Sequence, residues 1–192
     1  MAEAGSSEQG YLTGQLLVAM PGMADPRFAK AVVYICAHNA EGAMGLVVNK
    51  LVDSITFPDL LDQLEIEKAG HADEIRVHFG GPVETSRGFV LHSDDYLSES
   101  SMRVTGGMAL TATLDILRDL AGGSGPRHSL LALGYAGWGP GQLDGELQDN
   151  GWLSVAPDDA LVFDSDLENK WDRAIAKLGI SPFQLSGDAG HA

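Results

Sequence analysis

Short apolar runs, many of them alternating with polar positions, recur along the chain and predict β-strands. The predicted strands span residues 13–20, 31–38, 45–50, 75–79, 88–92, 102–105, 129–134, 152–156 and 160–163. Apolar residues repeating at intervals of three and four predict helices over residues 56–66, 105–123, 140–151 and 164–179. Thr56 and Asp59 form a predicted cap for the first helix, while Gly122 and Gly179 mark the ends of the second and fourth.

The order of these elements predicts the fold class. Residues 13–50 and 75–105 each hold several strands in succession with no helix between them. That order does not match the strict alternation of a doubly wound parallel sheet, so we expect an α/β (α+β) protein with helices packed on a mixed sheet. The chain has 192 residues, which fits a single domain. We place that domain at residues 11–182, between a disordered lead (1–10) and a loose tail (183–192).

Charge and cysteine content narrow the function classes. Twelve basic residues against 27 acidic ones give a net charge of −15, which repels nucleic-acid phosphates and anionic membranes. Cys36 is the only cysteine, so no intramolecular disulfide can form. The polar first ten residues lack the features of a signal peptide, and no apolar run approaches the length of a membrane span. We expect a cytoplasmic protein without direct nucleic-acid or membrane contact, and we expect no metal or cofactor.

The stretch "LGYAGWGPGQLDGEL" (133–147) concentrates glycine between a predicted strand and a predicted helix that begins near Pro140. Glycines before a helix can present free backbone N–H groups to an anion. Neither G-x-G-x-x-G nor a P-loop is present, however. The alternative is a tight turn whose glycines let the chain pass beneath two aromatic side chains. The pattern favours the structural interpretation. The candidate ligand residues here are Gly134, Tyr135, Gly137, Trp138, Gly139 and Gln142.

Cys36 and His38 are the candidate residues for thiol chemistry. Alternation along a strand places both on one face, where an imidazole beside a thiol supports a thiolate. Asn49 is the residue that would orient the histidine. A cysteine within an apolar strand is more often an inert buried side chain, and this interpretation is favoured. The segment "EGAMG" (41–45) is predicted to be a hairpin connection.

Arg87 and His92 are two further candidates, within "FGGPVETSRGFVLHSDD". An arginine can pair with a carboxylate of the protein or of a ligand, and in an acidic protein the structural partner is favoured. His92 with the two aspartates that follow is too sparse for a metal site. No strong catalytic signature stands out.

Four blocks spanning Gly14 to Ile180 together resemble one family. They are "GQLLVAMPGMADPRFAKAVVYICAHNAEGAMGLVVNK", "FGGPVETSRGFVLHS", "LGYAGWGPGQLDGELQDNGWL" and "ALVFDSDLENKWDRAIAKLGI". Their order and content are similar to the YqgE/AlgH family of uncharacterised bacterial proteins. The family often has proline where this chain has Leu51. The matched motif residues are Met20, Pro21, Asp25, Pro26, Phe28, Cys36, His38, Gly45, Asn49, Gly80, Gly81, Pro82, Arg87, His92, Gly134, Tyr135, Gly137, Trp138 and Gln142.

The resemblance implies a strongly bent, partly barrel-like sheet flanked by helices. It also brings an old label of transcriptional regulator and no settled enzyme activity. A net charge of −15 and the lack of a basic recognition helix argue against direct DNA contact, so regulation would act through a protein or small ligand.

Three hypotheses follow. The first is a non-enzymatic module that binds a small ligand or a protein, with a site that combines the 134–142 stretch with Arg87 or with the 20–28 loop. The second is a thiol-based sensor or enzyme that uses Cys36 and His38. Direct DNA binding ranks last.

Overall fold

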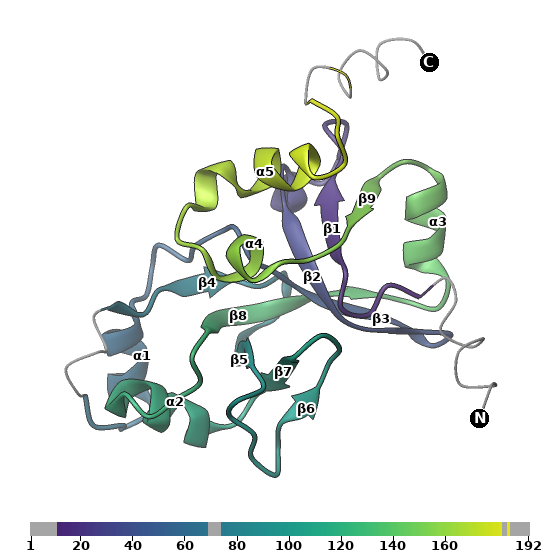
Figure 1. Cartoon of the computed structure of the whole chain (residues 1–192). Coiled ribbons are helices and arrows are strands. Elements are labelled where there is room, and N and C mark those ends of the chain that lie inside the picture. The colour runs from purple at the N-terminus through teal and green to yellow at the C-terminus, as the bar shows by residue number, and fades with distance from the viewer. Residues whose placement is uncertain (1–10, 69–73, 182–183, 185–192) are drawn as a thin grey trace.

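The computed structural model describes residues 11–68, 74–181 and 184 (Figure 1). The predicted lead, and all of the predicted tail except residue 184, lie outside these ranges. The strands are β1 (Leu16–Ala19), β2 (Val32–Asn39), β3 (Gly42–Val47), β4 (Val77–Phe79), β5 (Val83–Ser93), β6 (Met102–Arg103), β7 (Met108–Thr111), β8 (Ser129–Trp138) and β9 (Trp152–Val155). The helices are α1 (Phe57–Gln63), α2 (Leu114–Gly122), α3 (Gln142–Gln148), α4 (Asp159–Phe163) and α5 (Lys170–Ala176), with 3-10 turns η1 (Pro26–Phe28) and η3 (Leu167–Asn169).

The described strands join in one mixed, strongly curled sheet. Its order is β6-β7-β5-β8-β3-β2-β1-β9, and β4 pairs with β8 off this path. The β4–β8 pair is parallel and the other pairs are antiparallel. Helices flank the curl, with α1 and α2 towards one end of the molecule and α3 towards the other (Figure 1). The predicted fold class, a bent and partly barrel-like mixed sheet flanked by helices, is confirmed.

Three clusters of buried apolar side chains hold the helices on the sheet. One cluster packs α4 and α5 against the strands, for example through Trp171 and Ile175. A second packs α1 and α2, and a third packs Leu143 of α3 against strand residues that include Trp138 and Trp152. Burial of this apolar surface is the main term that stabilises the arrangement. No helix in the described part of the chain is long and apolar enough to cross a membrane.

The predicted strand over residues 160–163 is wrong, because this segment is helix α4. The Asp158 side chain accepts a hydrogen bond from the Leu161 N–H at 2.7 Å, which caps a short helix. The predicted helix over residues 105–123 begins only at Leu114, and its first part is strand β7. The helical spacing of Leu110, Leu114 and Leu117 is misleading here, because Leu110 belongs to β7 and only the other two belong to α2.

Two further boundaries differ from the prediction. The segment 41–45 is not only a connection, because β3 begins at Gly42 and the turn is confined to Ala40 and Glu41. Strand β8 does not end at Gly134 but continues to Trp138. The glycines up to residue 137 therefore belong to a central strand, not to a tight turn.

The glycine at position 134 allows two backbone segments to cross closely. Gly134 has a φ of +75°, and a Cβ at this position would overlap the Gly81 carbonyl oxygen. A Cβ at Gly81 would in turn overlap the backbone of Tyr135. Glycine is needed here because it alone combines a left-handed backbone with the absence of a side chain. This crossing brings the segment before β5 against the middle of β8.

Candidate functional site

A cleft of about 1,040 Å³ lies at the end of the sheet beside α3. We call it the tryptophan cleft. Its walls come from the loop of residues 20–28, Pro82 and Val83 at the start of β5, the end of β8 with α3, and residues 149–153 at the start of β9. Segments far apart in the sequence thus meet here because β1, which precedes the loop, pairs with β9. Trp138, Gln142, Glu146 and Trp152 are among its lining residues.

Local contacts hold the 20–28 loop over the cleft. The Met20 N–H donates to the Gly151 carbonyl at 3.0 Å, which ties the loop to the start of β9. Asp25 caps η1 by accepting from the Arg27 N–H, and its carboxylate also binds the Arg27 guanidinium at 2.7 Å. This hydrogen bonding to Arg27 lowers the pKa of Asp25. The Phe28 ring meets the edge of Trp152 at 5.7 Å between centroids. The loop is therefore anchored at both ends.

Glu146 is the polar centre of the cleft wall. Its Oε1 accepts from the indole Nε1–H of Trp138 at 3.1 Å and from that of Trp152 at 3.0 Å. Its Oε2 accepts from the Gln142 amide, one helical turn earlier, at 2.8 Å. The two indole rings meet edge to face at 6.0 Å. Four side chains thus form one interlocked group that orients the carboxylate. The sequence interpretation missed Glu146, although its spacing from Gln142 was a usable signal.

One backbone donor of the predicted anion cradle at the start of α3 is already used within the protein. The Gly139 N–H donates to the Gln142 side-chain oxygen at 2.9 Å. Gly141, with a φ of +72°, is the N-cap residue, and α3 has only seven residues. The Gly139 N–H, one of the donors that such a cradle would offer, is therefore taken up by Gln142.

Arg87 lies in a separate groove of about 710 Å³, not in the tryptophan cleft. Its guanidinium lies over the Phe89 ring at 5.1 Å, and its NH1 lies 3.6 Å from a Glu84 carboxylate oxygen. The groove and the cleft share Val83, Gly137 and Trp138 in their linings. The structure therefore brings parts of the 134–142 stretch close to both proposed companions, with the 20–28 loop on one side and Arg87 on the other.

His92 does not face a ligand cavity in the structure. Its side chain is fully buried. Nδ1 lies 2.8 Å from the Ser93 carbonyl oxygen and Nε2 lies 2.7 Å from the Thr111 hydroxyl. Burial lowers the pKa of the imidazole. Its ligand assignment is corrected to a structural one, because both ring nitrogens are hydrogen-bonded within the protein.

Cys36 and His38 do not lie side by side. The pairing of β2 with β3 shifts between Ile35 and Ala37, so Cys36 is the extra residue of a β-bulge. A bulge reverses the alternation that follows it. Cys36 accordingly belongs to the buried apolar cluster that also holds residues of α4 and α5, whereas His38 Nε2 lies 3.6 Å from the Asp144 carboxylate of α3. The alternation that predicted a shared face fails at this one residue.

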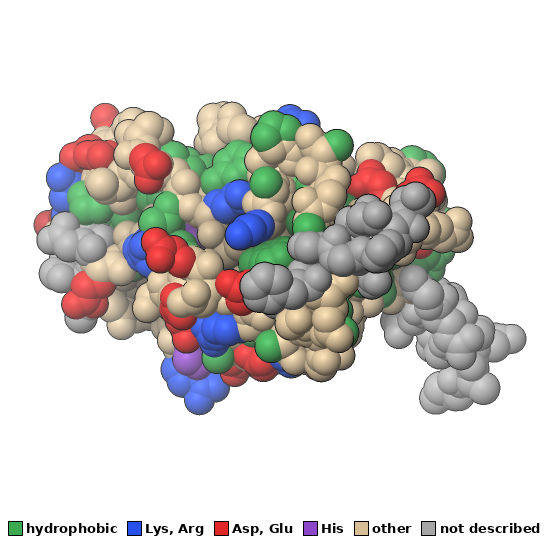
Figure 2. Space-filling model, turned by 90° about the horizontal axis from the view of Figure 1, so that it is seen from above, with side chains coloured by type: hydrophobic (Ala, Val, Ile, Leu, Met, Phe, Trp, Pro, Cys, Tyr) green, Lys and Arg blue, Asp and Glu red, His purple; other side chains and the backbone are tan. Residues whose placement is uncertain are grey.

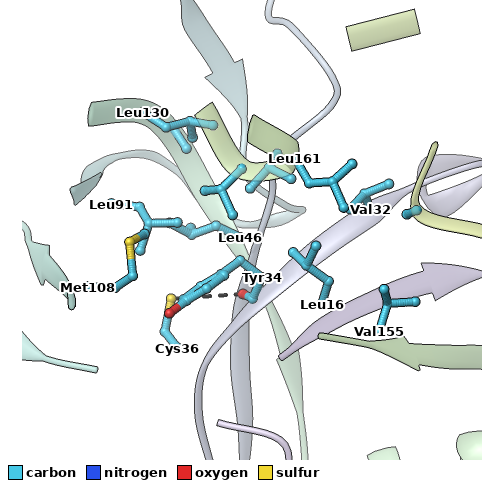
Figure 3. Close-up of a cluster of buried hydrophobic side chains, with 14 of the residues drawn as sticks. Leu16, Val32, Tyr34, Cys36, Leu46, Leu91, Met108, Leu130, Val155 and Leu161 are labelled. Carbon is cyan, nitrogen blue, oxygen red and sulfur yellow. Dashed lines mark hydrogen bonds between the residues drawn. The ribbon is translucent and has the colours of Figure 1, made fainter. Parts of the chain in front are cut away.

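The Cys36 thiol is buried in the same apolar cluster as Tyr34 and Met108 (Figure 3). Burial raises its pKa to about 12. Asn49 is also remote from the predicted role, because its side chain accepts from the Val32 N–H and donates to the Lys30 carbonyl, both at 2.9 Å. The geometry expected for thiol chemistry is therefore wrong on all three residues.

The described residues contain no group of three or more His, Cys, Asp or Glu side chains that could hold a metal ion. Viewed from above the orientation of Figure 1, basic side chains lie in separate groups with acidic ones between them (Figure 2).

Comparisons with known proteins show the family of this chain. The model of the AlgH-like family matches residues 16–183. The chain belongs to the AlgH-like family. A UPF0301 protein of Rhodospirillum rubrum is 57% identical over 184 residues, which cover 96% of each chain. One from Rhodopseudomonas palustris is 58% identical over 198 residues, covering 98% of this chain and 91% of the relative. The family resemblance seen in the sequence blocks is thus confirmed.

Two solved structures are similar to the fold. The solution structure of the AlgH protein from Pseudomonas aeruginosa superposes with a TM-score of 0.79 at 42% identity, covering 95% of this chain and 97% of that one. The crystal structure of protein DIP2367 from Corynebacterium diphtheriae gives a TM-score of 0.67 at 18% identity, covering 84% of each chain. The second likeness concerns the fold alone. The fold of this chain is therefore shared with the AlgH protein at 42% identity and with a second protein at 18% identity.

Proposed function

We propose that this member of the AlgH-like family is a non-enzymatic binding protein that holds a small organic molecule in the tryptophan cleft. The single observation that carries the proposal is the cleft itself, about 1,040 Å³ in volume and built from four segments of the chain. Small-molecule sites are typically concave, of roughly this size, and largely apolar with a few oriented polar groups. The interlocked carboxylate of Glu146 is such a group.

The character of the lining supports binding over catalysis. Its described side chains include aromatic, methionine and carboxylate groups, but no Ser, Thr, Cys, His or Lys. Its charged Asp25 and Arg27 are paired with each other. A regulatory role would be indirect, exerted by the ligand-bound protein in the cytoplasm. The net charge of −15 supports this indirect route over contact with a nucleic acid.

Gly22 offers a direct test, because it lines the cleft and a Cβ there meets no atom within 4 Å. Gly22→Phe should fill the cleft without disturbing the fold. Gly122→Phe is the matched control, since Gly122 also has open space around its Cβ but lies in α2, away from the cleft.

The assay screens a fragment library of cationic, neutral and anionic compounds by NMR, following the indole N–H signals of Trp138 and Trp152. Fragments should shift these signals in the wild type and in Gly122→Phe, and should fail to do so in folded Gly22→Phe. The proposal is wrong if no fragment shifts the two indole signals, or if the filled cleft binds the same fragments equally well.

A further inference from the structure

The charges inside the tryptophan cleft are unbalanced. Arg27 is the cation of its lining, and its Nε and NH2 both bind the Asp25 carboxylate, at 2.7 to 3.2 Å. The charges of Arg27 and Asp25 therefore cancel each other. Two further carboxylates, of Glu146 and Asp149, line the cleft, and no described Lys or Arg forms an ion pair with either one. The lining therefore carries an uncompensated negative charge.

The environment of Glu146 leaves room for one more donor. All three of its hydrogen-bond donors, two indoles and one amide, are neutral groups. Oε1 accepts two of these bonds, whereas Oε2 accepts only the one from Gln142. A carboxylate oxygen can accept two hydrogen bonds, so Oε2 retains acceptor capacity in the half-buried cleft wall. A cationic donor gains most from such an oxygen, because charge-assisted hydrogen bonds are about twice as strong as neutral ones.

The remaining walls suit an apolar body attached to that donor. Met20, Met23 and Phe28 of the loop face the cleft together with Trp152. Methionine side chains adapt to irregular apolar ligands, and aromatic rings also attract cations through their faces. The cleft thus combines an anionic centre with apolar and aromatic walls.

We propose that the ligand of the tryptophan cleft is an organic ammonium compound with an apolar or aromatic body. Its ammonium group donates to Glu146 Oε2, and its body packs against the methionines and Phe28 of the 20–28 loop. The overall charge of −15 favours the approach of such a cation. This inference rests on the proposed function and adds the chemical class of the ligand.

Three probes of similar shape and different charge distinguish the effect of ligand charge on affinity from that of shape: phenethylamine, phenethyl alcohol and phenylpropionate. Affinities are measured by NMR titration on the wild-type protein at pH 7 and low ionic strength. Phenethylamine should bind about tenfold more tightly than the alcohol, and phenylpropionate should bind most weakly. Added salt should reduce the advantage of the amine, since screening weakens the attraction between charges.

Substitution of the carboxylate provides the second part of the test. Glu146→Gln should weaken phenethylamine binding about tenfold and leave the alcohol nearly unchanged. Asp144→Asn removes the same charge from α3 but lies outside the lining of the cleft, so it controls for the loss of net charge. Should Glu146→Gln fail to fold, Asp149→Asn takes its place with a smaller loss in the same direction.

The outcomes distinguish this inference from the proposed function. If amine, alcohol and carboxylate bind equally well and Gly22→Phe blocks all three, the cleft binds small molecules but the ammonium preference is wrong. The same conclusion follows if Asp144→Asn weakens amine binding as much as Glu146→Gln does. If Gly22→Phe blocks none of the bound probes, the cleft is not the site and both proposals fail.

Discussion

Lys170, at the start of α5, is fully buried. Its Nζ donates to the Val48 carbonyl at 3.2 Å and to the Val162 carbonyl at 2.8 Å. Burial lowers its pKa from the ordinary 10.5 to about 8, against a partial opposing effect of the Asp164 carboxylate. The charged form is disfavoured because two carbonyl dipoles replace its water shell incompletely. We therefore predict that Lys170 makes the stability of the protein depend on pH in the alkaline range.

The sign and size of the effect follow from proton linkage. Between pH 8 and 10.5 the unfolded chain keeps its proton on Lys170 while the folded chain has released it. The unfolded state binds more protons there, so the free energy of unfolding rises with pH. One pKa unit corresponds to about 1.36 kcal/mol, so this contribution should grow by about 2.5 kcal/mol between pH 7 and pH 10.

Lys170→Met isolates this contribution. Urea unfolding of the wild type and the variant is followed by tryptophan fluorescence at several pH values from 7 to 10. Relative to the variant, the free energy of unfolding of the wild type should rise by about 2.5 kcal/mol over that range. Lys177→Met controls for the loss of a lysine from the protein surface. A difference between wild type and Lys170→Met that stays constant with pH would refute the reasoning.

Three further predictions concern buried groups. The Cys36 thiol, with its pKa raised to about 12, should resist alkylation at pH 8 until the protein is unfolded, and rapid labelling of native protein would contradict its burial. Gly134→Ala should lower the free energy of unfolding by at least about 2 kcal/mol through overlap with Gly81. Gly139→Ala should change it little in the same urea assay, because a Cβ there meets only the Gln142 side-chain oxygen, at 3.9 Å. Burial lowers the pKa of His78 from 6.5 to about 4. Between these pH values the unfolded state binds more protons than the folded state, so the free energy of unfolding should fall by about 3 kcal/mol as the pH is lowered from 6.5 to 4. In His78→Gln this loss of stability should disappear. A variant whose free energy of unfolding falls with acid as much as that of the wild type would contradict the prediction.

Much of the architecture could be predicted from the sequence where local signals agree. The cap formed by Thr56 and Asp59 marks α1, and both hydrogen bonds of the predicted capping box are present. Trp171 and Ala174 are buried on the predicted face of α5, although the same pattern placed the exposed Leu178 there as well. Segment 160–163 failed because a run of four apolar residues fits a strand and a short capped helix equally well.

The candidate site could be predicted only in part. The sequence pairs the 134–142 stretch with the 20–28 loop or with Arg87, and of that stretch Gly137, Trp138 and Gln142 line the tryptophan cleft together with the loop. The sequence is misleading for His92 and Asn49, because a polar side chain that forms hydrogen bonds within the protein cannot be told apart in a sequence from one that faces a ligand. Glu146 was missed because its two indole donors come from different strands, at positions 138 and 152.

The sequence by itself determined the mixed α/β class, the acidic charge and most of the elements, because these depend on composition and on the period of apolar residues. The family followed from the resemblance of its four motif blocks. Only the tertiary structure decided which polar groups meet. One bulged residue places His38 on the opposite face from Cys36, and the pairing of β1 with β9 brings the walls of the tryptophan cleft together. Both depend on strand register between distant segments, and a register is set by packing of the whole sheet, not by any local run of residues.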